Sequence, residues 1–282
     1  MNKTMIEKIH QANLEILLEV DRICRKHQIE YRLDAGTLIG AVRHQGFIPW
    51  DDDVDLAFLR KDYEKFLRIA PKELKKGLSI WFPDQACGGK VFYDFTPKII
   101  YENSRKCNPN SETAFYGEEL NHLCVDLFVL DEIADGKFAQ KIQILRMKII
   151  YGMAMAHRYR LDFQKYQGIS RLQVAILATA GKCFSMKRIY RWEKKAARAQ
   201  ENGKRKRLYW SNYQPDFVHM TVPKEAEEKA ELDFEGYRMM VPKDWNTVLT
   251  VVYGDYMTPP PKEKQVATHG DISNKGFFVG KM

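Results

Sequence analysis

The sequence predicts an α+β fold with a mixed β-sheet core, flanking helices and an added helical lobe. Strand-like and helix-like patterns alternate over the first 135 residues, and the next stretch, from Lys137 to about Arg207, is mostly helical in its periodicity. A last region of mixed pattern follows at 230–270. We therefore divide the chain into a core at 1–135, a basic helical lobe at 136–229 and a C-terminal segment at 230–282 that packs back on the core.

Hydrophobic spacing and turn residues locate the individual elements. The first helix has apolar residues at helical spacing, and the second ends near Pro71. Pro83 and the Gly88-Gly89 pair mark turns between strands. The predicted elements are helices at 5–28 and 59–74, a short helix at 38–42, and strands at 78–82, 90–101 and 123–131.

Composition narrows the class of protein. A hydrophobic content of 45% in 282 residues provides a sizeable core. The five cysteines are scattered, which favours a reducing compartment. The N-terminus lacks the basic and apolar pattern of a secretion signal, and the longest apolar runs, such as 174–180, are far too short to span a bilayer. These features predict a cytoplasmic protein.

The positive charge is concentrated in one segment. Residues 187–207 hold ten Lys or Arg and two Glu, which accounts for the whole net charge of +8. Such a run is either the solvated face of a helix or a contact for an anionic partner. The signatures of nucleic-acid recognition modules are missing, so we expect no nucleic acid. The other candidate for an anionic partner is the lipid surface at the inner face of the cytoplasmic membrane.

The stretch "WDDDVDLAF" at 50–58 places four carboxylates within five positions. Val54, Leu56 and Phe58 belong on the core face of a strand, and this phase puts Asp53 and Asp55 together on the other face, roughly 7 Å apart. Asp52 is in phase with the core residues, so we expect it to make hydrogen bonds at the mouth of the strand. Asp51 is expected to be solvated.

Asp53 and Asp55 are therefore candidate ligands for Mg²⁺ or Mn²⁺. Magnesium prefers oxygen ligands, needs only one or two carboxylates, and completes its shell with water and substrate phosphates. A bound cation would also offset the repulsion among these acids. The alternative is a solvated acidic loop that caps the next helix.

The segment before the acids predicts a phosphate-binding turn. Gly36 and Thr37 open a short apolar helix, and the N–H groups and dipole of a helix start favour anions. Arg43 and His44 follow at its far end, where Arg43 can clamp a phosphate with two hydrogen bonds. The alternative is an ordinary helix cap.

Asp126 is the one acid inside an apolar strand that ends at Asp131. A carboxylate without a partner there would cost several kcal/mol, so it needs a metal, a catalytic role or a salt bridge to a residue such as Lys98. As a third carboxylate it would complete the metal site or act as a general base toward an attacking hydroxyl.

These residues carry a resemblance to a known family. "DAGTLIGAVRHQGFIPWDDDVDLAF" at 34–58 resembles the signature of the LicD family of phosphotransferases, which includes fukutin and fukutin-related protein. "CVDLFVLD" at 124–131 and the segment 232–261 resemble further family features, whereas 137–229 is the divergent part. The resemblance implies a nucleotidyltransferase-like core, with Gly36-Thr37 as the turn, Asp53 and Asp55 as the metal pair and Asp126 as the third acid.

The resemblance also implies an activity. Family members are similar to enzymes that transfer a phospho-alcohol from a CDP-linked donor to a glycan hydroxyl and release CMP. CDP-choline is the favoured donor, with CDP-ribitol and CDP-glycerol as alternatives. The implied acceptor is a lipid-linked glycan, a precursor of teichoic acid, lipopolysaccharide or capsule. Arg43, His44 and Lys98 are candidates for stabilising the phosphates.

A choline donor would require a site for a quaternary ammonium, which aromatic cages provide through cation–π attraction. The candidates near the motifs are Phe47, Trp50, Tyr93 and Tyr116. A zinc site built from Cys87, Cys107, His122 and Cys124 has irregular spacing, and buried thiols are the simpler interpretation. His269 and Asp271 are further polar candidates for substrate contact.

Three other functions use the same features. A nucleotidyltransferase would share the metal site but release pyrophosphate. A GT-A glycosyltransferase also binds a metal–nucleotide through D-x-D, although the phosphate turn so close before the acids argues against it. A basic, non-enzymatic module that binds membrane or nucleic acid would account for 187–207 but not for the acidic strand.

Overall fold

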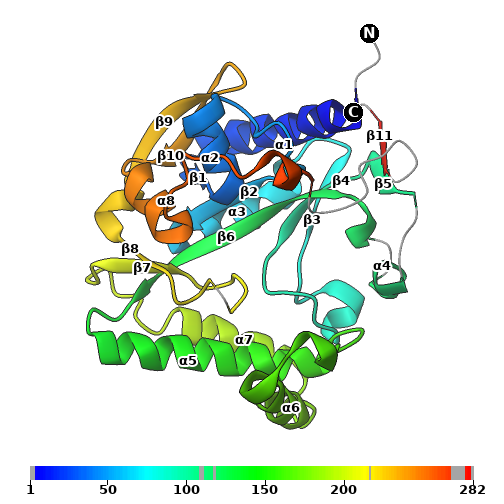
Figure 1. The fold of residues 1–282 in the computed structure, drawn as a ribbon, viewed down its shortest axis with the longest axis vertical. Coiled ribbons are helices and arrows are strands. Elements are labelled where there is room, and N and C mark those ends of the chain that lie inside the picture. Colours follow the sequence, from blue (N-terminus) through cyan, green and yellow to red (C-terminus); the bar gives the residue numbers. More distant parts are fainter. Residues whose placement is uncertain (1–3, 108–110, 117–118, 216, 268–276, 281–282) are drawn as a thin grey trace.

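The chain has the predicted α+β architecture, which the computed structural model presents as a mixed sheet with helices around it (Figure 1). One group of helices packs close to the sheet, and another lies at the end of the molecule farthest from the N-terminal helix. The residues that the structure describes are 4–107, 111–116, 119–215, 217–267 and 277–280.

The central sheet of the described residues has seven strands. They are β1 (Tyr31–Leu33), β2 (Asp55–Leu59), β3 (Leu78–Trp81), β4 (Lys98–Tyr101), β6 (Leu123–Ile133), β7 (Arg207–Trp210) and β8 (Thr221–Pro223). Five of them follow the order β1-β2-β6-β4-β3, while β7 pairs with the far end of β6 and β8 pairs with β7. Among the described strands, only β2 and β6 are parallel, and Asp55, the first residue of β2, lies opposite Asp126, the fourth residue of β6.

Two amphipathic helices, α1 (Met5–His27) and α3 (Arg60–Glu73), pack against the sheet. α1 starts with a capping box in which Thr4 and Glu7 exchange hydrogen bonds, and it buries one apolar face completely. Pro71 lies in the last turn of α3, and the helix ends two residues later at Glu73, close to the predicted end. The main hydrophobic core lies between these helices and the sheet.

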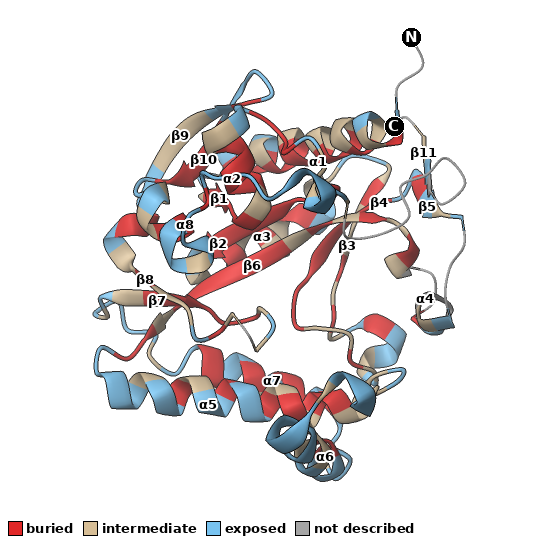
Figure 2. Ribbon diagram, viewed as in Figure 1, coloured by how far each residue is buried: buried red, intermediate tan, exposed pale blue. Residues whose placement is uncertain are grey.

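The predicted helical stretch contains α5 (Lys137–Ala154), α6 (Gly168–Gly181) and α7 (Met186–Ala197). A second hydrophobic core holds α5 and α7 to the sheet, because Met147 of α5 and Ile189 of α7 pack in one cluster with Ile133 and Tyr209 from β6 and β7. In Figure 2, the side of α5 that faces the rest of the molecule is buried, and its opposite side is exposed.

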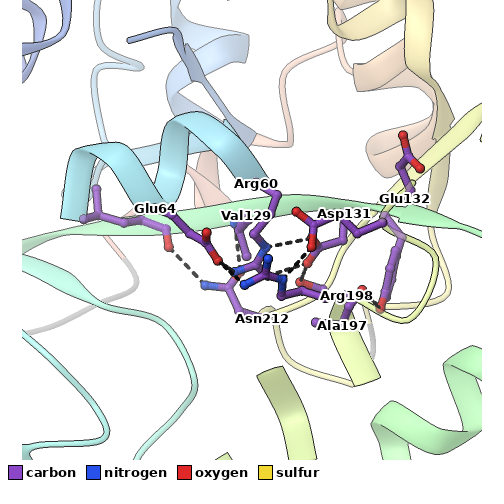
Figure 3. Close-up of polar contacts among 12 residues, drawn as sticks. Arg60, Glu64, Val129, Asp131, Glu132, Ala197, Arg198 and Asn212 are labelled. Atoms are coloured by element: carbon purple, nitrogen blue, oxygen red, sulfur yellow. Dashed lines mark hydrogen bonds and ion pairs between the residues drawn. The ribbon is translucent and has the colours of Figure 1, made fainter. Parts of the chain in front are cut away.

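Polar contacts also hold β6 against α3 and against the chain that follows β7 (Figure 3). Arg60 of α3 makes two hydrogen bonds to the buried Asp131 of β6, at 2.8 and 2.5 Å. Beyond β7, the side-chain oxygen of Asn212 accepts a hydrogen bond of 2.9 Å from the backbone N–H of Val129. Because both contacts end on β6, they fix this strand relative to α3 and to the chain that returns from the helices.

The C-terminal segment packs on the core. It contains β9 (Lys229–Phe234), β10 (Tyr237–Pro242) and α8 (Trp245–Tyr253), and its hairpin turns at Glu235-Gly236, where both residues have positive φ. Phe234 is fully buried against Phe47.

The remaining elements are α4 (Ser111–Phe115), β5 (Ser104–Lys106) and its partner β11 (Phe277–Val279). The division into three units stays a prediction, although β7 and β8, from the range predicted as helical, are strands of the central sheet.

One predicted strand is much shorter than expected. The range 90–101 is a strand only over Lys98–Tyr101. Pro97 precedes this strand and cannot donate to a sheet ladder, while Phe92 and Phe95 turn into the second core instead of alternating across a strand. The irregular chain before β4 places Tyr93 and Asp94 beside the functional site described next.

Candidate active site

The helix that follows β1 is joined to the acidic strand. This helix, α2 (Ala35–His44), starts before Gly36, so the predicted turn residues lie in its first turn. The Thr37 hydroxyl accepts a hydrogen bond of 3.0 Å from the backbone N–H of Asp55. A Cβ at Gly36 would lie only 2.5 Å from Oδ2 of Asp51, so a glycine lets that carboxylate approach the helix. Asp51, expected to be solvated, lies against the helix start.

Three aspartates meet where β2 and β6 begin to pair. Asp55 is the first residue of β2, and the parallel register places it directly opposite Asp126. Asp53 lies two residues earlier, before the strand, and lines the same cavity as the other two. Asp52 is buried next to them. The structure thus brings together the three acids that the sequence singles out.

The environment of Asp55 disfavours an isolated negative charge. Its side chain is buried, with 8% exposed. Burial raises the pKa of Asp55 well above its usual value, and the charges of Asp53 and Asp126 raise it further. Within the described residues, no hydrogen-bond donor or cation contacts the Asp55 carboxylate. A carboxylate in this position is satisfied by a proton or by a bound cation.

Asp126 has a protein cation as its partner. Nζ of Lys98 lies 2.6 Å from Oδ1 of Asp126 and 3.0 Å from Oδ2 of Asp94. Burial lowers the pKa of Lys98, but the two carboxylates outweigh this effect and raise it well above its usual value. Asp126 therefore forms the salt bridge to Lys98 that the sequence suggested as one explanation for a buried acid. The roles of Asp126 as metal ligand or general base stay predictions.

A cavity of about 810 Å³ opens in front of these acids. The beginnings of β2 and β6 form one wall, and residues of α5 and α6 form the opposite wall. This volume lies within the range of sites that bind small molecules and cofactors. Four basic side chains that suit an anionic ligand also line it: Lys106, Lys148, Arg158 and Lys165.

The predicted phosphate-binding residues of α2 lie outside this cavity. Gly36 and Thr37 are not part of its lining. Arg43 donates to the carbonyl oxygen of Tyr256 at 2.8 Å and to the ring of His44 at 3.0 Å. α2 therefore contacts the acids from outside the cavity, Arg43 contacts the C-terminal segment, and His44 lies against Trp50.

Of the predicted choline-binding residues, only Tyr93 lines the cavity. Phe47 stacks on His10 with a centroid distance of 4.4 Å, and Trp50 lies edge-on to His44. The hydroxyl of Tyr116 donates to the carbonyl oxygen of Phe92 at 2.6 Å. The ring of Tyr93 itself faces two protein cations, Lys98 at 5.7 Å and Arg158 at 5.8 Å.

The structure adds site residues that the sequence did not indicate. Tyr213 lines the cavity, where it stacks on Phe128 at 4.2 Å. Burial raises the pKa of Tyr213, and the charge of Asp55 raises it further. Tyr151 and Tyr166 line the same cavity. These tyrosines come from the divergent part of the sequence, where no motif marks them.

A magnesium site would rest on two carboxylates. In the described part of the chain, no group of three or more His, Cys, Asp or Glu side chains is arranged to hold a metal ion, and this includes the cysteines and His122 considered for zinc. Asp53 and Asp55 still fit Mg²⁺, because two carboxylates suffice when substrate phosphates and water supply the other oxygens. His269 and Asp271 lie outside the described residues.

A parallel pair of acid-bearing strands in a mixed sheet faces a large cavity, which is the arrangement expected of a nucleotidyltransferase-type domain. Comparison with known families agrees, since residues 28–138 match the LicD/FKTN/FKRP nucleotidyltransferase domain. The chain therefore contains a domain of the LicD family over residues 28–138.

Similarity to one characterised protein extends beyond the domain. The chain is 25% identical to the lipopolysaccharide cholinephosphotransferase LicD of Haemophilus influenzae, over 95% of this chain and 97% of that protein. Uncharacterized proteins of Rickettsia typhi and Rickettsia prowazekii are 38% and 35% identical, over 26% and 38% of this chain and 24% and 42% of their own length. No helix within the described ranges is both long and apolar enough to cross a membrane.

Proposed function

We propose that the protein transfers phosphocholine from CDP-choline to a hydroxyl of a cell-surface glycan and releases CMP. The observation that carries the proposal is the buried Asp55 beside Asp53, at the wall of a cavity that also holds basic side chains. Similarity to a lipopolysaccharide cholinephosphotransferase over nearly the whole chain supports the choice of donor and acceptor. Precursors of lipopolysaccharide, teichoic acid or capsule all offer the required hydroxyl.

Asp53 and Asp55 are the residues that would hold Mg²⁺ or Mn²⁺. When bound, the ion would neutralise charge on the donor diphosphate, which is the main electrostatic demand of phosphoryl transfer. The fit rests on the Asp55 carboxylate, which is buried among like charges and has no donor from the described residues. Thr37 holds the backbone at Asp55, so this carboxylate is fixed in direction.

The opposite wall suits the anionic part of the donor. Arg158 and Lys165 face the cavity from the chain between α5 and α6, and Lys148 faces it from α5. Nε of Arg158 is buried without a hydrogen-bond partner, so a donor phosphate would satisfy it. Arg43, His44, Gly36 and Thr37 would then support the fold of the site and not contact the phosphates.

Asp126 is the candidate general base for the acceptor hydroxyl. Its carboxylate is partly exposed, at 30%, and is fixed by Lys98 at 2.6 Å. The second oxygen is thus available for a proton from the acceptor while the pair keeps the group oriented. Lys98 acts here as a positioning residue, and Asp94 shares its charge.

The choline group would bind among the tyrosines of the cavity. Tyr151, Tyr166 and Tyr213 line it together, and aromatic faces bind quaternary ammonium groups through cation–π attraction, whereas the ring of Tyr93 already faces Lys98 and Arg158. Phe47, Trp50 and Tyr116 lie elsewhere, so the cage involves other aromatic residues than those expected from the sequence. A CDP-ribitol or CDP-glycerol donor would use the same hydroxyl groups as hydrogen-bond partners.

A lipid-linked acceptor requires the protein to work at a membrane surface. The basic run at 187–207 supplies charge for peripheral contact with anionic lipid. Part of this charge is used within the protein, because Lys194 pairs with Asp84 at 2.8 Å and Arg198 pairs with Glu64 at 2.8 Å. The other basic residues of the run would provide the contact.

The proposal is tested by following the leaving group. Purified protein is incubated with Mg²⁺, lipid-linked glycan and CDP-choline, CDP-ribitol or CDP-glycerol in separate reactions. We expect CMP and choline-labelled glycan, whereas pyrophosphate or sugar transfer would identify a nucleotidyltransferase or a glycosyltransferase. Asp53→Asn should abolish turnover, and Asp233→Asn, which removes an exposed carboxylate far from the cavity, should not. Full activity of the Asp53 variant would refute the metal assignment.

A further inference from the structure

The outer face of α5 carries a stripe of exposed apolar side chains. Phe138 is 78% exposed, Ile142 53%, Leu145 57% and Ile149 37%. Their spacings of four, three and four residues place all of them on one side of the helix. The opposite side, with Met147 and Ile150, is buried in the second core. α5 therefore has two apolar faces, and only one of them is covered by the described residues.

α6 has the same property beside the cavity. Ile169 is 76% exposed, Leu172 61% and Ile176 59%, at spacings of three and four residues. The neighbouring face of the helix, with Ser170, Gln173, Val174 and Leu177, lines the cavity in front of the acids. The stripe of α6 thus lies at the rim of the active-site cavity, and both helices lie at the end of the molecule away from α1 (Figure 1).

The polar residues around the two stripes have one sign of charge. Neither α5 nor α6 contains an Asp or a Glu. Lys141 and Lys148 flank the α5 stripe on one side and Arg146 flanks it on the other, as the 3.6-residue turn places them. Arg171 is the charged residue of α6, and it is exposed. A protein partner usually offers both signs of charge, whereas an anionic bilayer offers negative charge above an apolar interior.

We propose that α5 and α6 form a docking surface for an anionic lipid bilayer, with their apolar stripes inserted in the interfacial layer. A helix with lysines or arginines beside exposed large apolar side chains is typical of such a surface, because hydrophobic burial and charge attraction add together. The proposal extends the proposed function, on which it depends only for the lipid-linked nature of the acceptor. The rim position of α6 would let the glycan enter the cavity while its lipid stays in the bilayer.

This surface differs from the basic run of α7. The apolar residues Met186, Ile189 and Tyr190 of α7 are buried in the second core. α7 can therefore add attraction to anionic lipid but has no comparable stripe to insert. A single weak signal gives only marginal membrane binding, and a second signal makes binding stable. In this arrangement α5 and α6 supply the hydrophobic signal, and the basic side chains of all three helices supply the electrostatic one.

Vesicle co-sedimentation tests the inference without donor or acceptor. The full chain is mixed with vesicles of phosphatidylcholine alone or with about a third phosphatidylglycerol. We expect binding to the anionic vesicles, and a loss of at least about tenfold in the pairs Ile142→Gln with Leu145→Gln and Ile169→Gln with Leu172→Gln. Val266→Gln is the matched control, because Val266 is as exposed as Leu145, at 57%, but lies outside these helices. Wild-type binding by both pairs, or no binding by the parent protein, would overturn the inference.

The charge component and the alternative occupant have separate tests. Lys141→Gln and Arg146→Gln should each weaken anionic-vesicle binding about fivefold at low salt. Sedimentation velocity should show the parent protein as a monomer. A dimer that the stripe variants abolish would instead assign the stripes to a second copy of the chain. Asp53→Asn should bind vesicles as well as the parent does. A failed transfer assay with intact, stripe-dependent binding would reject the proposed function and leave the docking surface standing.

Discussion

The hydroxyl oxygen of Thr37 lies 3.0 Å from the backbone nitrogen of Asp55 and accepts its hydrogen bond. This contact joins the first turn of α2 to the first residue of β2. The backbone N–H of Asp34 also donates to the carbonyl oxygen of Asp55 at 3.0 Å, so both backbone polar groups of Asp55 are held by the chain that leads into α2. The direction of the Asp55 carboxylate therefore depends on residues that do not line the cavity.

Thr37→Val should lower both stability and transfer activity. Valine has the same shape but cannot accept a hydrogen bond, so the buried N–H of Asp55 loses its partner at a cost of about 1–3 kcal/mol. Thr37→Ser keeps the acceptor and should stay close to the parent in both respects. Denaturant unfolding and turnover with CDP-choline measure the two effects. Equal behaviour of the two variants would show that the hydroxyl does not position Asp55.

Lys98→Met should destabilise the protein strongly. Lys98 is buried between Asp126 and Asp94, and removing one partner of a buried pair costs about 3–5 kcal/mol because the remaining charges lose their compensation. Lys194→Met is a matched control, since Lys194 pairs with Asp84 at 2.8 Å but is 61% exposed, and such pairs contribute only about 1 kcal/mol or less. Urea unfolding of both variants gives the comparison. Losses of similar size would contradict the role of burial.

Gly40→Ala should be costly because of a backbone contact. A Cβ at Gly40 would lie 2.4 Å from the carbonyl oxygen of Gly46, and a backbone atom cannot move aside as a flexible side chain can. We expect a loss of about 1–3 kcal/mol, the usual cost of overpacking. Gly136→Ala, with no atom within 4 Å of the added carbon, should be nearly neutral. Thermal unfolding tests the pair, and a neutral Gly40 variant would show that the loop after α2 can shift.

The sequence was informative where local rules determine structure. Alternation of apolar residues located β2, and a run that is apolar on both faces located β6. The phase of the acids agrees with the position of Asp53 and Asp55 at one wall of the cavity, and the parallel register places Asp126 opposite Asp55. The helical spacing of α1 and α3 and the stop near Pro71 depend on neighbours in the chain in the same way.

Contacts between distant segments could not be predicted in this way. Arg43 contacts the carbonyl oxygen of Tyr256, and Tyr213 stacks on Phe128, over sequence distances that no periodicity encodes. The strand expected at 90–101 was shortened because Phe92 and Phe95 pack with helices that the local pattern does not reveal. The sequence offered both a phosphate and Asp126 as partners of Lys98. The pairing of β4 with β6 places Lys98 opposite Asp126, and a local pattern cannot reveal this register.

Glu193→Gln should reduce the pH dependence of stability between about pH 4.5 and pH 8. Glu193 is buried, with 6% exposed, and burial raises its pKa from 4.5 to about 8, although nearby Arg60 opposes part of this effect. Between these values the folded state binds more protons than the unfolded state, so the free energy of unfolding falls as the pH rises. One such group contributes a slope of at most about 1.4 kcal/mol per pH unit.

Glutamine does not titrate, so the variant should lose this contribution and gain stability relative to the parent as the pH rises toward 8. Some decline remains, because burial also raises the pKa of Asp34 to about 6 and that of Glu227 to about 8, which act in the same direction. Urea unfolding at pH 5, 6, 7 and 8 measures the slopes, with the exposed Glu225→Gln as control. Parallel curves for the parent and the Glu193 variant would mean that Glu193 has the same proton affinity in the folded and unfolded chains.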